Sequence, residues 1–156
     1  MTNDQICNVL NQILGFELAG SNMYLHFSYF VKGQDRVQLS QWFRTQASEG
    51  IMHGTLVGDK IVSLGGVPIT QPGDGKYNPS NPNEIVYSVK YSDVNEMLKI
   101  AVHFEKTAFN KYKELIDCIG EGDDSNFTTT KLKMFLENIM IQEIEHIDEV
   151  EKMLDR

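Results

Sequence analysis

The feature that most constrains this chain is the recurrence of apolar residues at steps of three and four along four long segments. Such steps keep one face of an α-helix pointing in a single direction, so each segment predicts an amphipathic helix. The first three expected helices run from about Asn3 to Lys32, from about Val37 to Leu64, and from near Ser92 and Asp93 to Gly120. The fourth begins between about Ser125 and Thr128.

The residues at the ends of these segments fit helix boundaries. Asn3 is a plausible N-cap, because its side chain can accept a hydrogen bond from a free backbone amide. Gly33 and Gly65 follow the first and second segments, where a glycine commonly ends a helix. Pro68 then prevents the second helix from continuing.

A long connection, Gly65 to Tyr91, contains all four prolines. Long loops within compact domains usually have a structural purpose. This one can carry the chain along the whole bundle, so that the second and third helices run parallel, and Glu84–Tyr91 can form a short helix or an extended piece within it. The sequence therefore predicts an all-α, four-helix bundle with one long crossover, as a single domain over residues 1–156.

Composition limits the classes of function. The net charge of −8 opposes binding to DNA, and no apolar run is long enough for a membrane span or a signal peptide. Cys7 and Cys118 are too few for a disulfide framework, so we expect free thiols that are buried or half-buried, in a cytoplasmic protein.

Two carboxylates interrupt the apolar stripes. Glu17 and Glu105 each occupy a core position, and each has a tyrosine seven residues later, Tyr24 and Tyr112. A buried carboxylate is costly unless it is paired or binds a metal. The tyrosines either hydrogen-bond a metal-binding carboxylate or are ordinary aromatic core residues.

The fourth segment adds Glu143 and His146, one helical turn apart on the apolar stripe. Such a pair can bind one metal ion, and oxygen-rich sites with a few imidazoles suit iron or manganese better than structural zinc. The alternative is a buried polar network without metal. Because each half of the chain pairs a Glu-bearing helix with a His-bearing one, we infer pseudo-twofold symmetry.

His53 lies on the stripe of the second segment, but Gly50 precedes it by three residues where a glutamate would complete the same motif. Glu49 lies four residues before His53, about 100° around the helix from Gly50. A local π-bulge could turn Glu49 toward the core. Alternatively, Glu49 is a solvated surface residue.

Together these residues resemble the ferritin-like superfamily, nearest to bacterioferritin and to Dps-like proteins with a bacterioferritin-type site. The segments LGFELAGSNMYLHF, VNEMLKIAVHFE and QEIEHIDEVEKML carry the likeness. It implies a di-iron centre inside each subunit, where O2 or H2O2 oxidises iron(II), and a hollow shell that stores the mineral. The implied catalytic and metal-binding residues are Glu17, His53, Glu105, Glu143 and His146, with Glu49 as a further ligand and Tyr24 and Tyr112 beside them.

The resemblance also bears on cofactors and assembly. Manganese or zinc can substitute for iron, and haem is left open because Ile51 stands where bacterioferritin has its haem methionine. The chain ends about ten residues after His146, which favours a Dps-like 12-subunit shell over a 24-subunit one. Ser28 and Ser40 replace the two histidines of the Dps site between subunits.

The expected function is that of an iron-oxidising, iron-storing shell protein, a ferroxidase that binds neither DNA nor membranes. One alternative is a di-iron peroxidase of the rubrerythrin type that forms no cage. Another is a shell subunit whose altered second-helix motif impairs oxidation.

Overall fold

The computed structural model describes residues 1–70, 93–120 and 127–154, and within these ranges it contains four helices and no strand. They are α1 (Asn3–Phe30), α2 (Arg36–Ser63), α4 (Val94–Gly120) and α5 (Phe127–Leu154). The predicted all-α bundle is therefore confirmed, and each helix matches an expected segment to within a few residues.

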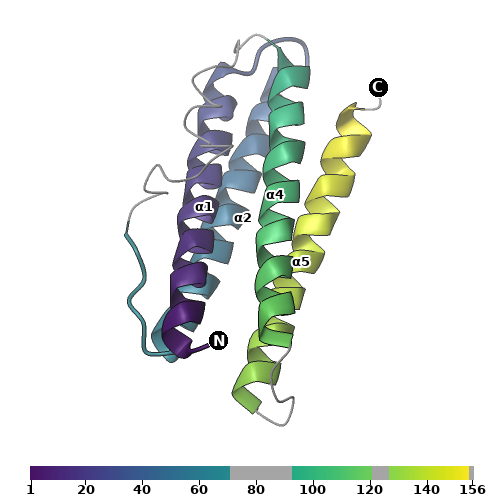
Figure 1. Cartoon of the computed structure of the whole chain (residues 1–156). Coiled ribbons are helices and arrows are strands. Elements are labelled where there is room, and N and C mark those ends of the chain that lie inside the picture. The colour runs from purple at the N-terminus through teal and green to yellow at the C-terminus, as the bar shows by residue number, and fades with distance from the viewer. Residues whose placement is uncertain (71–92, 121–126, 155–156) are drawn as a thin grey trace.

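The helices form two antiparallel pairs, α1 with α2 and α4 with α5 (Figure 1). Helix α2 descends in this view, and so does α4, so the second and third helices run parallel as expected (Figure 1). The long crossover joins the lower end of α2 to the upper end of α4. Its predicted element at Glu84–Tyr91 lies outside the described residues.

The N-cap of the first helix lies one residue earlier than expected. Thr2, not Asn3, is the N-cap: its side chain accepts a hydrogen bond from the Gln5 amide at 3.2 Å, and the Gln5 side chain accepts one from the Thr2 amide at 2.9 Å. This reciprocal capping box satisfies two backbone donors, which Asn3 alone would not do. Gly33 and Gly65, at φ 102° and 85°, supply the left-handed conformations that follow α1 and α2.

The core consists of two apolar clusters, one toward each end of the bundle. One includes Phe27, Phe43 and Met97; the other includes Leu10 and Leu136. Along each helix the clusters meet at the level of the buried glutamates and histidines. The apolar side chains thus enclose one polar layer in the middle of the bundle.

The two cysteines differ in their surroundings. Cys7 is buried, as expected, but Cys118 is exposed, so the prediction of a buried or half-buried thiol is wrong for that residue. Cys118 immediately precedes the core residue Ile119, and neighbouring positions on an α-helix point about 100° apart.

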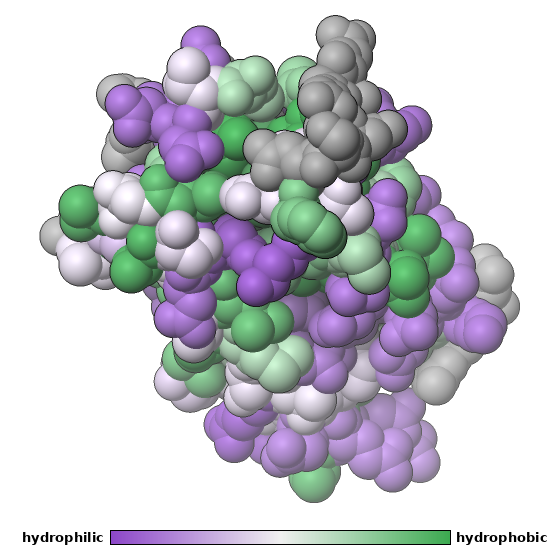
Figure 2. Space-filling model, turned by 90° about the horizontal axis from the view of Figure 1, so that it is seen from below, coloured by the Kyte–Doolittle hydropathy of each residue, from purple (hydrophilic) through white to green (hydrophobic). Residues whose placement is uncertain are grey.

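The surface is mixed in character. Seen from below, apolar and polar side chains are interspersed (Figure 2). None of the helices in the described ranges has the length and hydropathy that crossing a membrane requires.

Candidate metal centre

All four described helices contribute a carboxylate or an imidazole to the polar layer. Helix α1 provides Glu17, α2 provides His53, α4 provides Glu105, and α5 provides both Glu143 and His146. The first four of these residues are at most 3% exposed. The five residues singled out from the sequence therefore come together because each occupies the inward-facing stripe of its helix.

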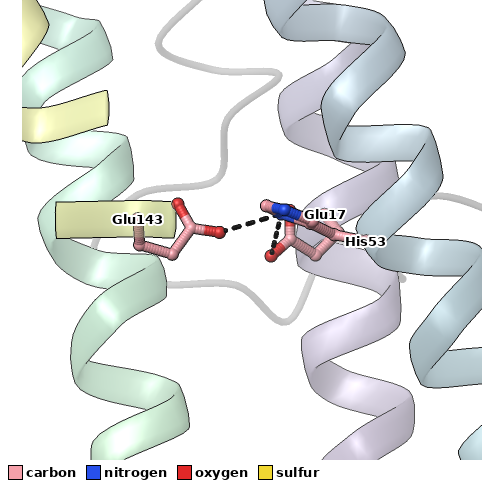
Figure 3. A group of neighbouring side chains, drawn as sticks. All are labelled: Glu17, His53 and Glu143. Carbon is pink, nitrogen blue, oxygen red and sulfur yellow. Dashed lines mark ion pairs between the residues drawn. The ribbon is translucent and has the colours of Figure 1, made fainter. Parts of the chain in front are cut away.

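The first cluster consists of Glu17, His53 and Glu143, whose candidate ligand atoms all lie within 4.8 Å of one another. The Nδ1 atom of His53 lies 3.1 Å from Glu143 Oε1 and 3.9 Å from Glu17 Oε1. Figure 3 shows the Glu143 side chain extending toward the other two residues across the bundle. Two carboxylates and one imidazole nitrogen thus converge on one point.

The second cluster consists of Glu105, Glu143 and His146, which meet the same 4.8 Å limit. Here the Nδ1 atom of His146 lies 3.8 Å from Glu105 Oε2 and 3.9 Å from Glu143 Oε2. Each cluster therefore offers one imidazole and one carboxylate of its own, and the two clusters share Glu143.

The shared carboxylate fits a cation. Both oxygens of Glu143 are buried, and no hydrogen-bond donor in the described part of the chain satisfies either of them. Burial and the neighbouring Glu17 and Glu105 raise the pKa of Glu143 well above its usual value. Buried carboxylates that lack a donor need a proton or a positive ion. A divalent cation in each cluster would supply that charge to both oxygens.

The two tyrosines hydrogen-bond the outer carboxylates across the bundle. Tyr24 donates to Glu105 Oε1 at 2.5 Å, and Tyr112 donates to Glu17 Oε1 at 2.8 Å. Each tyrosine thus bonds the carboxylate of the other half of the chain. Burial, together with the adjacent carboxylate, raises the pKa of both tyrosines well above 10, so both remain proton donors.

Neighbouring groups also shift the pKa values of His146 and Glu105, against the effect of burial. Burial alone would lower the pKa of His146, but Glu105 and Glu49 raise it to about 9. Burial alone would raise the pKa of Glu105, but its hydrogen bonds, including that from Tyr24, keep it below its usual value. Glu105 and His146 therefore form a mutually stabilised pair when no cation is present.

Glu49 does not reach the interior by a π-bulge, because residues 36–63 form a regular α-helix. Its half-exposed carboxylate instead contacts Nε2 of His146, on the side of the ring that faces away from the clusters. Glu49 belongs to neither group of candidate ligand atoms. It is therefore neither a fully solvated residue nor an inward-facing one.

Gly50 faces α1, where Ser21 fills the neighbouring space. A Cβ atom at position 50 would lie 2.2 Å from Ser21 Oγ, far inside van der Waals contact. The Ser21 hydroxyl donates to the Glu17 carbonyl at 3.1 Å. No glutamate side chain at this position can point into the clusters without displacing Ser21.

Gln142 is the residue that the sequence analysis missed. Its Oε1 atom lies 2.7 Å from Nε2 of His53. The available signal was its spacing: Gln142 precedes His146 by four residues, as Glu49 precedes His53. The spacing alone does not show that the Gln142 amide contacts a histidine, because that contact depends on how α2 packs against α5.

Comparison with known proteins agrees with this geometry. The family model described as the ferritin-like domain matches residues 7–156. The chain belongs to the ferritin-like family. The resemblance inferred from the sequence motifs is thereby confirmed.

A sequence relative matches part of the chain. Over 67 residues the chain is 25% identical to a bacterial non-heme ferritin of Bacteroides fragilis strain 638R, and the match covers 43% of this chain and 42% of that protein. The chain therefore matches less than half the length of this relative.

Two solved structures cover nearly the whole chain. A ferritin-like, diiron-carboxylate protein from Bacillus anthracis str. Ames is 26% identical, with a TM-score of 0.77 over 97% of this chain and 96% of that one. A bacterioferritin-related protein from Bacteroides fragilis, described as a dodecameric thioferritin, is 22% identical, with a TM-score of 0.77 over 99% of this chain and 87% of that one. The second likeness bears on the fold alone.

Proposed function

We propose that this protein is a ferroxidase and a cytoplasmic subunit of an iron-storing cage. Its substrates would be two iron(II) ions held in the two clusters that share Glu143. Membership of the ferritin-like family and the likeness to a diiron-carboxylate protein support this proposal. The observation that carries it is the buried Glu143 carboxylate, which lacks a hydrogen-bond donor and lies between two sets of further ligand atoms.

The chemistry balances with two ions and one oxidant. Each iron(II) gives up one electron; H2O2 accepts both, with two protons, and becomes two water molecules. With O2 as the oxidant, the same two electrons and two protons produce H2O2. Holding the ions as a pair favours a two-electron reduction over the release of one-electron radicals.

The chain's own groups would hold the ions and set their charge. Glu17 and His53 would bind one ion, Glu105 and His146 the other, and Glu143 both. Hard carboxylate oxygens together with imidazole nitrogens suit iron(II). Tyr24 and Tyr112 would keep the outer carboxylates oriented, because each donates one hydrogen bond to a carboxylate oxygen and leaves the other oxygen for an ion.

The test compares iron oxidation by the wild-type protein with that of a variant carrying Glu105→Ala and Glu143→Ala. After anaerobic loading with iron(II), O2 or H2O2 is added, and iron(III) formation is followed by absorbance. We expect the variant to oxidise iron more slowly by at least the roughly 10- to 100-fold that loss of an outer-shell partner costs a metal site. Its metal occupancy should also fall.

The matched control is Glu145→Ala, which removes an exposed carboxylate from the same helix as Glu143. This variant should oxidise iron at the wild-type rate. If the double variant does so as well, the bundle interior is not the oxidation site and the proposal is wrong.

A second candidate function is a cage subunit that binds iron without oxidising it efficiently. Gly50 favours this candidate, because the clusters contain only one shared carboxylate and Ser21 occupies the space where a second would project. Wild-type protein that binds two ions per chain but oxidises iron(II) no faster than buffer would establish this alternative.

A further inference from the structure

The two histidines are supported by the same cross-bundle arrangement. Nε2 of His53, on α2, faces Gln142 on α5, whereas Nε2 of His146, on α5, faces Glu49 on α2. Each partner lies four residues before the other histidine. The pseudo-twofold symmetry inferred from the sequence thus extends to the groups behind both imidazole rings.

The ring orientations give these contacts a chemical consequence. In both histidines Nδ1 faces a cluster of carboxylates while Nε2 faces the outer partner. Gln142 Oε1 is the hydrogen-bond partner of Nε2 of His53, and a Glu49 carboxylate oxygen forms an ion-pair contact with Nε2 of His146, so Nε2 is the nitrogen that carries the proton in each neutral ring. Nδ1 then presents its lone pair to the cluster, which is the state that binds a cation.

The two outer partners differ in charge. Gln142 offers His53 a neutral amide oxygen, whereas Glu49 offers His146 a carboxylate. A carboxylate that accepts the outer N–H of a metal-binding histidine makes the ring a stronger donor than a neutral acceptor does. Each cluster contains two carboxylates, counting the shared Glu143, so the outer partner is the main difference between their ligand sets.

We propose that Glu49 and Gln142 are positioning residues that make the two clusters unequal, so that the first divalent cation binds Glu105, Glu143 and His146 and the second binds Glu17, Glu143 and His53. This inference rests on the proposed function in taking both clusters as cation sites. It requires neither an oxidation step nor a particular oxidant.

The first experiment is a titration of the full-length protein with cobalt(II), followed by calorimetry and by visible absorbance. The wild-type protein should bind two ions in separate steps. Glu49→Gln keeps the acceptor oxygen but removes the charge, so it should weaken the first step by about 10- to 100-fold. Gln142→Glu should strengthen the second step, and Glu145→Gln, at an exposed position on α5, should change neither.

The second experiment locates the first ion. Crystals grown with one equivalent of cobalt(II) should show anomalous density beside Nδ1 of His146 in the wild-type protein. In the variant carrying both Glu49→Gln and Gln142→Glu, the density should move to Nδ1 of His53.

The outcomes separate this inference from the proposed function. If two ions bind and the substitutions leave both steps unchanged, or if the first ion lies beside His53 in the wild-type protein, the inequality is overturned and the proposed function is unaffected. If no ion binds to the wild-type protein, the proposed function itself is overturned, and this inference with it.

Discussion

At the scale of single residues, the site is defined by hydrogen bonds that the sequence could suggest but not assign. Glu17 and Tyr24 lie on the same helix, seven residues apart, yet Tyr24 bonds Glu105 on α4. Tyr112 likewise bonds Glu17. The spacing showed that hydroxyl and carboxylate share a face, and only the packing of α1 against α4 determined which pairs meet.

The Tyr112–Glu17 bond gives a prediction about stability. Replacing Tyr112 with Phe removes the hydroxyl while keeping the ring, which leaves a buried Glu17 oxygen without its donor. We expect the metal-free protein to lose about 1–3 kcal/mol of unfolding free energy, measured by urea denaturation. Tyr29→Phe is the control, because this ring is 58% exposed. Equal stability of the two variants would contradict the assigned role of the bond.

At the scale of helices, the packing of α1 against α2 explains why a glycine stands at position 50, where the motif would have a glutamate. The sequence left open whether Glu49 turns inward through a π-bulge or stays in solvent. The helix is regular, and Glu49 takes a third position, against the outer nitrogen of His146. The close approach of α1 to Gly50 excludes a longer side chain at that position, since Ser21 occupies the space that it would need.

This approach can be tested by a double-mutant cycle. Gly50→Ala places a Cβ atom 2.2 Å from Ser21 Oγ and should destabilise the protein by about 1–3 kcal/mol despite alanine's better helix propensity. Adding Ser21→Ala should recover most of that loss, because the next atoms, the Glu17 carbonyl oxygen and Ser21 Cβ, are 3.4 and 3.5 Å away. Thermal unfolding of the single and double variants measures the coupling.

The matched control for this cycle is Gly58→Ala, on the same helix. There the nearest atom to the new Cβ would be Pro68 Cβ at 3.8 Å, an ordinary contact, so stability should rise by up to about 1 kcal/mol. If Gly50→Ala raises stability by as much as Gly58→Ala does, Ser21 does not restrict position 50.

At the scale of the whole molecule, the exposed apolar side chains bear on assembly. Met134 and Ile141, seven residues apart on the same face of α5, are 60% and 54% exposed. Leu25 and Tyr29 on α1 are also exposed. We expect these side chains to lie in contacts between subunits of the proposed cage.

We expect the protein in solution to be a large assembly of many copies, as the proposed cage requires, measured by sedimentation or mass photometry. Met134→Glu combined with Ile141→Glu should shift the population to much smaller species while circular dichroism stays helical. Asn8→Glu adds a charge at an exposed polar position of α1 and is the control. A wild-type monomer or dimer would contradict the cage.

The sequence by itself determined the helices and the composition of the polar layer. Steps of three and four place Glu17, His53, Glu105, Glu143 and His146 on inward-facing stripes, because helical geometry fixes which residues share a face. The long crossover and the parallel second and third helices followed from the length of the connection. The polar layer that forms the candidate site therefore lies where periodicity had placed these residues.

Only the tertiary structure decided how these groups pair. The Gln142 contact to His53, the Glu49 contact to His146, the exchange of tyrosine partners and the exclusion of a side chain at Gly50 all join different helices. Such contacts depend on the relative rotation and axial offset of packed helices, which are set by interdigitating side chains over the whole interface. A periodic pattern specifies a face, but not the atom that a neighbouring helix brings to it.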